Sequence, residues 1–522
     1  MRYGEATLRE MIDRNAIWYG DRPAFVLGDT RITHGTFRAQ AFRLASALNL
    51  RGMRTQDRVS ILSMNSIEFC VAYGACEAFG FVAATVNFRL AGAEMLHIIN
   101  DSMSRVLIFE AAYLDLIEGL RPHLETIEHF VVIGATRVPD WASDWVDVLN
   151  EGDPAGPDLP LPGALDLVYL IYTSGTTGRS KGCMLDHYAE TATGQIIAAA
   201  MQLGVADRTL LMMPLFHIGA KAIALAQQWV GGTVHLHRAF DPAAICATIE
   251  AEKITATHMA PTLVQALLEA PERERHDLSS LRTLLYSAAA MPPSLLRRAL
   301  EAFGPIFQQM YGQTEGIGTL LPVTAHEVDE SGAPHRHLNS VGHPFIGCEV
   351  SIRDHEERSL PAGEVGEICI RGPVVMQGYW NNSPATLETL RDGWLHTGDV
   401  GYLDAEGYAF LVDRKKDVII SGGENIYSRE VEDAILSHPS VAAVAVIGTP
   451  DVKWGEAVTA VVVLRAGSSL TEADLVAHCR TLIAGYKRPR RTIFSDSLPL
   501  LPSGKINKPA LRVAHTAPEF TA

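Results

Sequence analysis

The feature that most constrains the fold is an apolar run that leads directly into a loop of small and hydroxyl-bearing residues. Residues 165–172 (LDLVYLIY) are almost continuously apolar, which favours a buried strand. The next ten residues, 173–182 (TSGTTGRSKG), combine glycines, hydroxyl groups and a lysine. Glycines permit close approach of the backbone, and hydroxyl and ammonium groups donate hydrogen bonds to phosphate oxygens. The pattern therefore predicts a buried strand that ends in a polyphosphate-binding loop.

The common phosphate-loop motifs do not describe this loop. A Walker A loop needs Gly directly before its Lys and Ser or Thr after it, whereas Ser180 and Gly182 flank Lys181 here. The chain also contains no G-x-G-x-x-G motif. These differences argue against a P-loop kinase and against a Rossmann dinucleotide site. For the loop taken alone, an ordinary Gly/Ser/Thr surface loop remains the alternative.

The N-terminal part alternates between helix and strand patterns. Residues 37–52 (FRAQAFRLASALNLRG) indicate a helix, whereas 58–64 (RVSILSM) and 105–110 (RVLIFE) are typical of strands. This alternation predicts an α/β fold with a largely parallel sheet. Four prolines within residues 152–163 indicate a surface connection, and a second α/β stretch runs from there to about residue 371.

The C-terminal part has a different organisation. We expect it to be a small α+β domain joined to the rest at residues 413–417. Its elements are predicted as a helix at 428–438, strands at 441–448 and 456–464, and a helix at 471–483.

Charge and composition restrict the partners of the protein. The 522 residues include 44 Lys and Arg against 60 Asp and Glu, a net charge of −16, which argues against a nucleic-acid binder. The length suggests about three structural units. The seven cysteines are scattered and form no C-x-x-C, so we expect reduced thiols. Since the sequence shows neither a signal peptide nor an apolar membrane span, it predicts a cytoplasmic protein.

Seven motifs in order along the chain carry a family resemblance. They are YTSGTTGRSKG (172–182), PLFH (214–217), YGQTE (311–315), GEVGEICIRGP (363–373), GWLHTGDVGY (393–402), DRKKDVIISGGENIYSREVE (413–432) and LPSGKINK (501–508). Together they resemble the adenylate-forming superfamily of acyl-CoA synthetases, peptide-synthetase adenylation domains and luciferases. The resemblance covers nearly the whole chain.

This resemblance implies the domain organisation and the reaction. The expected fold is α/β, with a large N-terminal domain (1–413) of α/β subdomains, mostly parallel sheets and a β-rich subdomain. A small mobile α+β domain (414–522) follows, with its hinge near Lys416. The implied reaction is attack of a carboxylate on the α-phosphorus of ATP, followed by transfer of the acyl group to coenzyme A. ATP, Mg²⁺ and coenzyme A are therefore the expected cofactors and co-substrates. Dimers are common in the family, but the sequence reveals no interface.

Most of the implied nucleotide site comes from the motif residues. The residues expected to bind ATP or AMP are Thr173, Ser174, Gly175, Thr176, Thr177, Gly178, Lys181, Ser287, Ala288, Ala289, Gln309, Tyr311, Gly312, Thr314, Asp399 and Arg414. Tyr311 has an aromatic face that can stack on adenine, although a lone tyrosine would more often be a core residue. Asp399 is expected to accept both ribose hydroxyls, because a carboxylate accepts several hydrogen bonds, and Arg414 to support the ribose.

Three residues are implied in the chemistry. Lys505 is expected to reach the acyl carboxylate and the α-phosphate, where charge develops during adenylation. Glu315 resembles the ligand of a Mg²⁺ that bridges phosphate oxygens. His217 resembles a residue that borders the acyl pocket and moves during the cycle. Taken singly, each has a simpler interpretation, as a solvated tail lysine, a surface carboxylate and a core histidine.

The loop SGGENIY is the form found in acyl-CoA synthetases and favours coenzyme A as the acceptor. Gly422, Gly423 and Glu424 are the implied coenzyme A-binding residues, because glycines leave a narrow passage for a thiol arm. The resemblance implies that a rotation at Lys416 replaces Lys505 in the active site with this loop between the two half-reactions. Ser428 departs from the family, where proline is frequent at this position.

The implied acyl pocket consists mainly of small or apolar residues. They are His217, Gly219, Ala220, Lys221, Ser287, Ala288 and Met310. Met310 replaces a frequent glycine. The set suits a hydrophobic medium- or long-chain fatty, alicyclic or aromatic acid. Lys221 is either a ligand for a polar tail or a side chain that extends to the surface.

Two other functions remain as alternatives. An adenylate-forming enzyme can transfer its acyl group to a carrier protein or an amine instead of coenzyme A. A non-catalytic nucleotide sensor on the same fold is the second alternative, although Lys181, Glu315, Asp399, Arg414 and Lys505 are all present.

Overall fold

The computed structural model describes residues 6–173, 179–289, 291–326, 336–500 and 506–515. The chain divides into two compact units. The first comprises Met1–Met291, Arg297–Val350 and Ile370–Leu395, and the second comprises Pro292–Leu296, Ser351–Cys369 and His396–Ala522. The proposed boundary at 413/414 stays a prediction, because this division groups the strands just before it with the C-terminal segment.

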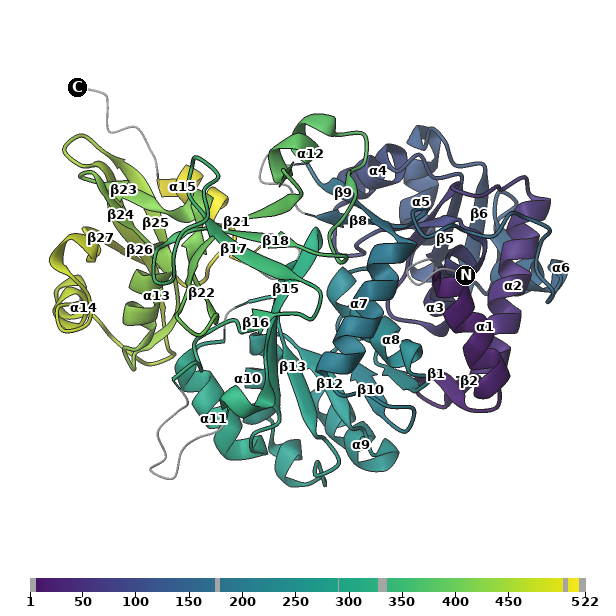
Figure 1. Cartoon of the computed structure of the whole chain (residues 1–522), viewed down its shortest axis with the longest axis horizontal. Helices are drawn as coiled ribbons and strands as arrows, with labels where there is room; N and C mark the ends of the chain where they lie inside the picture. The colour runs from purple at the N-terminus through teal and green to yellow at the C-terminus, as the bar shows by residue number, and fades with distance from the viewer. Residues whose placement is uncertain (1–5, 174–178, 290, 327–335, 501–505, 516–522) are drawn as a thin grey trace. The chain divides into compact units, whose positions relative to one another are not determined.

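Within the described residues, the first unit contains an eight-stranded sheet that is parallel except at one end (Figure 1). Its strands, in spatial order, are β19 (Gly378–Tyr379), β9 (Lys181–Asp186), β8 (Leu167–Thr173), β4 (Val82–Thr85), β3 (Arg58–Leu62), β5 (Val106–Glu110), β6 (His129–Ile133) and β7 (Ser143–Asp144). Strands β19 and β8 pair antiparallel with β9, and the others pair parallel. The predicted strands at 58–64, 105–110 and 165–172 are confirmed as β3, β5 and β8.

A nine-stranded sheet, again counted over the described residues, forms the other half of the first unit. Its strands, in spatial order, are β16 (His343–Pro344), β15 (Gly316–Leu321), β14 (Phe307–Gln313), β13 (Thr283–Tyr286), β12 (Ala256–Met259), β10 (Arg208–Leu211), β11 (Thr233–Leu236), β1 (Pro23–Leu27) and β2 (Thr30–Thr33). Strands β14 to β1 pair parallel, and the pairs at both ends are antiparallel. The α/β class with mostly parallel sheets is confirmed.

Helices join the two sheets into one core. The helices concerned are α1 (Leu8–Trp18), α2 (His34–Leu50), α3 (Ile67–Phe79), α7 (His187–Ala200) and α8 (Ile218–Trp229). Their buried side chains and those of both sheets form one apolar cluster. Helix α3 begins at Ser66, whose hydroxyl accepts the amide of Phe69, and ends at Gly80 in the left-handed conformation (φ +70°). Helix α2 confirms the helix predicted over 37–52.

The second unit contains most of one sheet and all of another. The first sheet is formed by β17 (Glu349–Arg353), β18 (Gly366–Arg371), β21 (Trp394–Leu403), β20 (Leu390–Arg391) and β22 (Ala409–Arg414). The second is formed by β24 (Glu424–Ile426), β23 (Ile419–Ser421), β26 (Gly455–Leu464), β25 (Val441–Asp451) and β27 (Arg491–Phe494). Helices α13 (Ser428–Leu436), α14 (Glu472–Cys479) and α15 (Lys508–His515) complete the C-terminal segment. The predicted helix, strand, strand and helix are therefore confirmed as α13, β25, β26 and α14, whereas β23, β24, β27 and α15 were not predicted.

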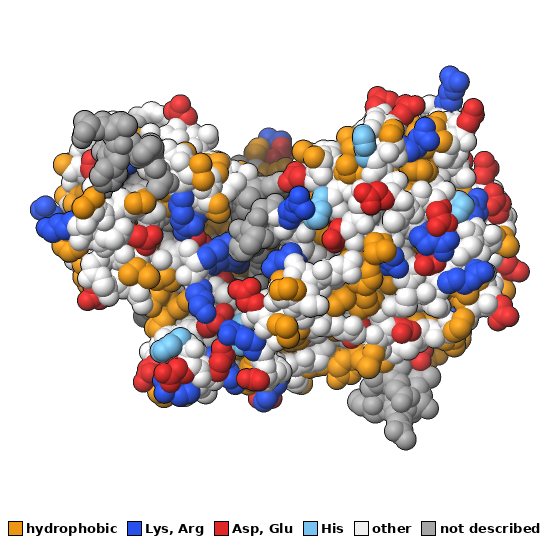
Figure 2. All heavy atoms as spheres, turned by 90° about the horizontal axis from the view of Figure 1, so that it is seen from above, with side chains coloured by type: hydrophobic (Ala, Val, Ile, Leu, Met, Phe, Trp, Pro, Cys, Tyr) orange, Lys and Arg blue, Asp and Glu red, His pale blue; other side chains and the backbone are white. Residues whose placement is uncertain are grey.

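The distribution of surface charge and the state of the cysteines agree with the sequence analysis. Lysine and arginine side chains are interspersed with aspartate and glutamate over the described surface drawn in Figure 2. All seven cysteines are free thiols, and only Cys348 is not fully buried. None of the helices in the described part of the chain offers an apolar stretch of the length needed to cross a bilayer.

A buried ion pair lies in the core of the first unit. The Lys221 ammonium lies 2.6 Å from a carboxylate oxygen of Glu77, and the two side chains are 9% and 2% exposed. The Tyr169 hydroxyl donates to the same oxygen over 2.6 Å, and the ring centroid of Tyr73 lies 4.6 Å from the ammonium. The interpretation of Lys221 as a surface lysine is therefore wrong, because Glu77 on α3 compensates its charge inside the protein. The pair joins α8, α3 and β8.

A buried glutamate beside this pair carries a proton at neutral pH. Burial is the main cause that raises the pKa of Glu190 to about 8, and the charges of Asp186 and Glu77 raise it further against the opposing effect of Lys221. The Lys221 ammonium thus lies beside Glu77, while the neutral form of Glu190 is favoured at neutral pH.

We predict that Glu77→Leu alone lowers the free energy of unfolding by about 3–5 kcal/mol, because it leaves the Lys221 charge buried without a partner. The double variant Glu77→Leu with Lys221→Met should recover most of this loss, since both charges are then removed. Chemical denaturation of the two variants measures the difference. Equal stability of the single and the double variant would contradict the assigned role of the pair.

Candidate active site

The strand–loop unit predicted to bind phosphates is formed by β8 and β9. Thr173, the last residue of β8, pairs antiparallel with Lys181, the first residue of β9. The predicted phosphate-loop residues Ser174, Gly175, Thr176, Thr177 and Gly178 lie outside the described residues. The Lys181 ammonium lies 4.3 Å from the ring centroid of Tyr379 on β19. The described ends of the loop therefore present a hydroxyl and an ammonium group at the end of a buried strand.

Glu315 lies in the turn between β14 and β15, and it is a buried carboxylate rather than a surface one. The Tyr379 hydroxyl donates to Glu315 Oε1 over 2.6 Å. Burial, followed by the charge of Glu315, raises the pKa of the Tyr379 hydroxyl above its usual range, so the tyrosine remains a donor. Tyr379 thus connects Lys181 and Glu315, which are distant in the sequence. We did not predict this residue, because its only signal is the pairing of β19 with β9.

The predicted adenine platform follows β13. Ala288 has φ +72°, in the left-handed region that residues with a Cβ rarely adopt, and Ala288 and Ala289 are exposed. This backbone therefore carries local strain at the carboxyl end of a parallel strand, the edge where α/β proteins bind ligands.

The predicted nucleotide residues of the next strand lie on and just after β14. Tyr311 is buried, Gln309 accepts the hydroxyl of Tyr286 over 3.2 Å, and Thr314 is half-buried. At Gly312, near the end of β14, a Cβ would lie 2.7 Å from the Cα of Ile317, so this position requires glycine. Whether Tyr311 stacks on a base stays a prediction.

The predicted acyl-pocket residues of α8 lie around its first turn. His217 is the half-buried N-cap of α8, and its ring centroid lies 4.4 Å from that of Phe216. A Cβ at Gly219 would lie 3.5 Å from Cε1 of His258, and His258 Nε2 lies 2.7 Å from the Ser287 hydroxyl. His258 therefore connects two predicted pocket residues, Gly219 and Ser287, and was itself not predicted. Ala220 and Met310 are buried.

In the second unit, the predicted ribose-binding residues are cross-strand neighbours. Asp399 on β21 pairs with Arg414 on β22, and Arg414 Nε lies 3.0 Å from Asp399 Oδ1. Asp399 is buried and Arg414 is exposed. The arginine thus orients a buried carboxylate at the end of its strand.

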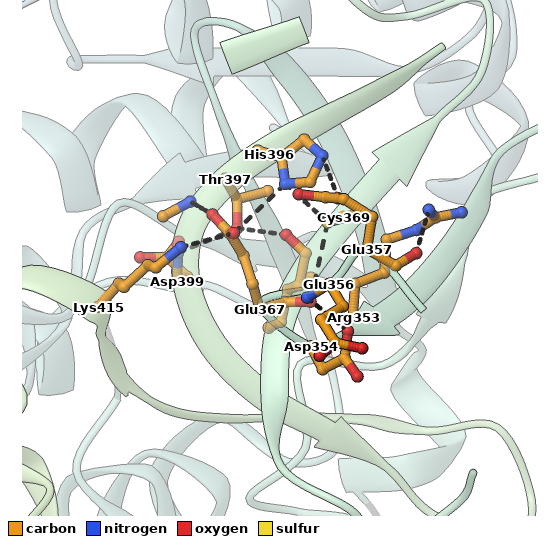
Figure 3. A network of polar contacts seen from close by, with 12 residues as sticks. Arg353, Asp354, Glu356, Glu357, Glu367, Cys369, His396, Thr397, Asp399 and Lys415 are labelled. Atoms are coloured by element: carbon orange, nitrogen blue, oxygen red, sulfur yellow. Dashed lines mark hydrogen bonds and ion pairs between the residues drawn. The ribbon is translucent and has the colours of Figure 1, made fainter. Parts of the chain in front are cut away.

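A polar network supports this strand pair, and Figure 3 shows how its side chains meet. His396 lies between two glutamates, with Nδ1 3.3 Å from Glu367 and Nε2 3.2 Å from Glu357. Glu367 also accepts the Lys415 ammonium over 3.1 Å and the Gly398 amide over 3.1 Å. Burial alone would raise the pKa of Glu367, but hydrogen bonds from His396 and Lys415 outweigh it and hold the pKa at about 2. Two sequence motifs, 363–373 and 393–402, are therefore joined by this carboxylate.

The predicted hinge and coenzyme A loop are adjacent in the chain. Lys416 is exposed, and the next residue, Asp417, pairs with Arg512 over 2.7 Å. Gly422 and Gly423 form the turn between β23 and β24 with φ +65° and +87°, which explains why both are glycines. A Cβ at Gly422 would lie 2.8 Å from the Trp454 ring.

Two predicted residues of this region remain, Glu424 and Lys505. Glu424 begins β24 and is exposed. Lys505 lies outside the described residues. The proposed roles of the loop and of the lysine stay predictions.

The hydrogen bonds of Ser428 explain why serine stands here instead of the proline that is frequent in the family. Its amide and its hydroxyl both donate to the buried carboxylate of Asp413, and its hydroxyl accepts the Lys508 ammonium over 2.7 Å. Lys508 also pairs with Glu432 over 2.8 Å. A proline has neither the amide nor the hydroxyl, so serine here fastens α13 and α15 to the residue that precedes Arg414.

We predict that Glu367→Gln lowers the free energy of unfolding at neutral pH by about 1–3 kcal/mol, because it removes the charge from a carboxylate that accepts several hydrogen bonds. The folded-state pKa of Glu367, about 2, lies below its ordinary value of 4.5. Its stabilisation is therefore complete above about pH 4.5 and is lost as the pH falls toward 2. Unfolding measured between pH 7 and 3 should show the variant approaching the wild type in acid. A constant difference across this range would contradict the assignment.

Comparisons with known proteins agree with this geometry. The family model of the AMP-binding enzymes matches residues 12–380, and that of the AMP-binding enzyme C-terminal domain matches residues 430–505. A feruloyl-CoA synthase from an Amycolatopsis species is 40% identical over 487 residues, which are 93% of this chain and 94% of that protein. The medium/long-chain fatty acid–CoA ligase FadD8 of Mycobacterium tuberculosis is 36% identical over 514 residues, covering 94% of this chain and 87% of that protein.

A solved structure shares the whole fold. The amide bond synthetase McbA from Marinactinospora thermotolerans superposes with a TM-score of 0.87 at 30% identity and covers 98% of this chain and 100% of its own. The chain belongs to the AMP-binding enzymes of the adenylate-forming superfamily and is an AMP-forming acyl-CoA synthetase.

Proposed function

We propose that this enzyme activates a hydrophobic carboxylic acid with ATP to an acyl-adenylate and then transfers the acyl group to coenzyme A. The observation that carries the proposal is the cluster of Lys181, Glu315 and Tyr379 at the end of β8. It places an ammonium and a buried carboxylate beside the loop that the sequence assigns to phosphates. The ammonium can neutralise phosphate oxygens, and the carboxylate can bind the cation that accompanies them.

In the first half-reaction, a carboxylate oxygen of the acid attacks the α-phosphorus of ATP, and pyrophosphate leaves with the electron pair of the broken P–O bond. Lys181 neutralises phosphate charge, and Lys505 is proposed to stabilise the charge that develops on the acyl carboxylate and the α-phosphate. Asp399 and Arg414 hold the ribose in this proposal.

The donor set at Glu315 fits a magnesium ion. Over the described residues, no group of three or more His, Cys, Asp or Glu side chains could hold a metal ion. A single buried carboxylate fits Mg²⁺, which takes one or two protein carboxylates and completes its shell with phosphate oxygens and water. When bound, Mg²⁺ would neutralise charge on the phosphate oxygens. Glu315 provides the carboxylate, and Tyr379 holds it in place.

In the second half-reaction, the thiol of coenzyme A attacks the acyl carbonyl, and AMP leaves. Gly422, Gly423 and Glu424 are proposed to bind the thiol arm. Rotation at Lys416 is proposed to bring this loop into use after Lys505 has acted. The left-handed turn at the two glycines supports a passage for a narrow ligand, because no described residue lies within 4 Å of where a Cβ at Gly423 would be.

The acid is proposed to be hydrophobic. Gly219, Ala220 and Met310 offer a small and apolar surface, and the two curated relatives act, by their names, on an aromatic acid and on fatty acids. An aromatic acid and a medium- or long-chain fatty acid are therefore the substrates to test first.

A second function, transfer to an amine instead of coenzyme A, is favoured by the likeness to the amide bond synthetase. The two functions share the first half-reaction. AMP release that requires an amine or a carrier protein and is unaffected by coenzyme A would favour this alternative.

The first test measures pyrophosphate release over a panel of fatty, aromatic and alicyclic acids, with mass identification of the thioester. We predict that Lys505→Ala lowers the rate of adenylation by about 10²–10³ or more. The same variant should convert a supplied acyl-adenylate to the thioester at close to the wild-type rate. Equal loss of both steps would contradict the role of Lys505, and release of ADP instead of AMP would overturn the proposed function.

The second test concerns the tyrosine that holds Glu315. We predict that Tyr379→Phe raises the Mg²⁺ concentration needed for half-maximal activity by about tenfold, because the loss of one hydrogen bond frees the carboxylate to move. Binding of Mn²⁺ to the enzyme with ATP, followed by electron paramagnetic resonance, gives a readout besides activity. As a control, Tyr402→Phe removes a hydroxyl from β21 and should leave the metal dependence unchanged. An unchanged Mg²⁺ requirement in Tyr379→Phe would exclude the positioning role.

A further inference from the structure

The order of strands in the nine-stranded sheet changes direction between β10 and β12. These strands are parallel neighbours. The chain leaves β10 through α8 to reach β11 on one side, and leaves β12 through α10 (Pro261–Glu269) to reach β13 on the other side (Figure 1). The connections therefore diverge between β10 and β12. In open α/β sheets, ligands bind outside the carboxyl ends of strands at such a switch point.

His258 occupies this switch point. It is the penultimate residue of β12 and lies opposite Leu211, the last residue of β10. The side chain is 1% exposed, and its Nε2 lies 2.7 Å from the hydroxyl of Ser287, which follows β13. Burial lowers the pKa of His258 to about 4, so its ring is neutral at physiological pH.

The other ring nitrogen has no partner among the described residues. His258 Nδ1 is buried and makes no hydrogen bond there. A buried polar atom left unsatisfied destabilises the protein, and a ligand that pairs with it removes this cost.

Cε1 of the ring, the carbon between the two nitrogens, faces the first turn of α8. A Cβ at Gly219 would lie 3.5 Å from this atom. Because residue 219 is glycine, no side chain occupies that position beside the ring. Helix α8 also begins there, and the amides of a helix N-terminus favour an electron-rich oxygen nearby.

We propose that His258 is a specificity-determining residue whose Nδ1 binds a hydroxyl substituent on the acyl group, and that the substrate class is hydroxylated aromatic acids. This inference rests on the proposed function. A neutral imidazole presents either a donor or an acceptor at Nδ1, depending on the tautomer that Ser287 selects. A hydroxyl group can accept a hydrogen bond from one tautomer and donate one to the other, whereas a methyl group or an unsubstituted ring edge can do neither.

An aromatic skeleton fits the same observations. The site is buried and flanked by Gly219 and the apolar residues of α8. The part of the substrate around the hydroxyl must therefore lose its hydration at little cost in free energy. A ring also holds its substituent at a fixed position and therefore loses little conformational entropy on binding.

The test compares matched acids that differ only in one hydroxyl group. We use cinnamate and its 2-, 3- and 4-hydroxy derivatives and measure kcat/KM from pyrophosphate release. The wild type should prefer the best hydroxy acid over cinnamate by about tenfold or more, because a site built to bind a hydroxyl rejects the analogue that lacks it. His258→Leu should reduce this ratio to about twofold or less, and His258→Asn, which retains a hydrogen-bonding group, should keep part of it.

His235→Leu is the matched control. His235 is also a buried histidine of this sheet whose pKa is lowered to about 4 by burial, but it lines a cavity at the amino ends of β10 and β11. This variant should keep the wild-type ratio. Calorimetric titration with non-hydrolysable adenylate analogues of the same acids gives the ratio of affinities independently of turnover.

The outcomes separate the two proposals. An equal preference for parent and hydroxy acids in the wild type, or a ratio that persists in His258→Leu, overturns the inference and leaves the proposed function intact. Failure of the wild type to form AMP from any acid overturns the proposed function as well.

Discussion

Parallel strand pairing is the constraint on which the first unit depends. Because parallel strands end at the same edge of a sheet, the residues that follow β10, β12 and β13 lie on one edge, although Ser287 comes 70 positions after His217 in the chain. The switch in strand order also lies at that edge, where open α/β sheets generally bind their ligands. The predicted pocket residues meet there as a consequence of topology, not of sequence proximity.

Antiparallel strands at the edges of the two sheets position Tyr379 and Glu315. The short strand β19 pairs with β9 and brings Tyr379 to Glu315 and Lys181. The turn between β14 and β15 carries Glu315 itself. The chemical groups of the first unit are thus positioned by sheet edges, where the chain can turn back without interrupting the parallel core.

The two units stabilise their buried charged groups in different ways. Lys221 is neutralised by Glu77, while burial raises the pKa of the neighbouring Glu190 to about 8 and so favours its neutral form. In the second unit, Glu367 remains ionised because His396, Lys415 and an amide donate to it. These arrangements follow one rule: a carboxylate inside the protein is ionised only where donors outweigh the cost of burial.

The sequence by itself determined the α/β class, the strand that precedes the phosphate loop, the order of elements in the C-terminal segment and the family motifs. These features are local, because apolar periodicity and glycine content are read within a few residues. Only the tertiary structure decided the partner of Lys221, the contact of Tyr379 with Glu315 and the place of His258. Each of these depends on strand pairing or helix packing between segments that are far apart in the chain, and no local pattern records which side chains such packing brings together.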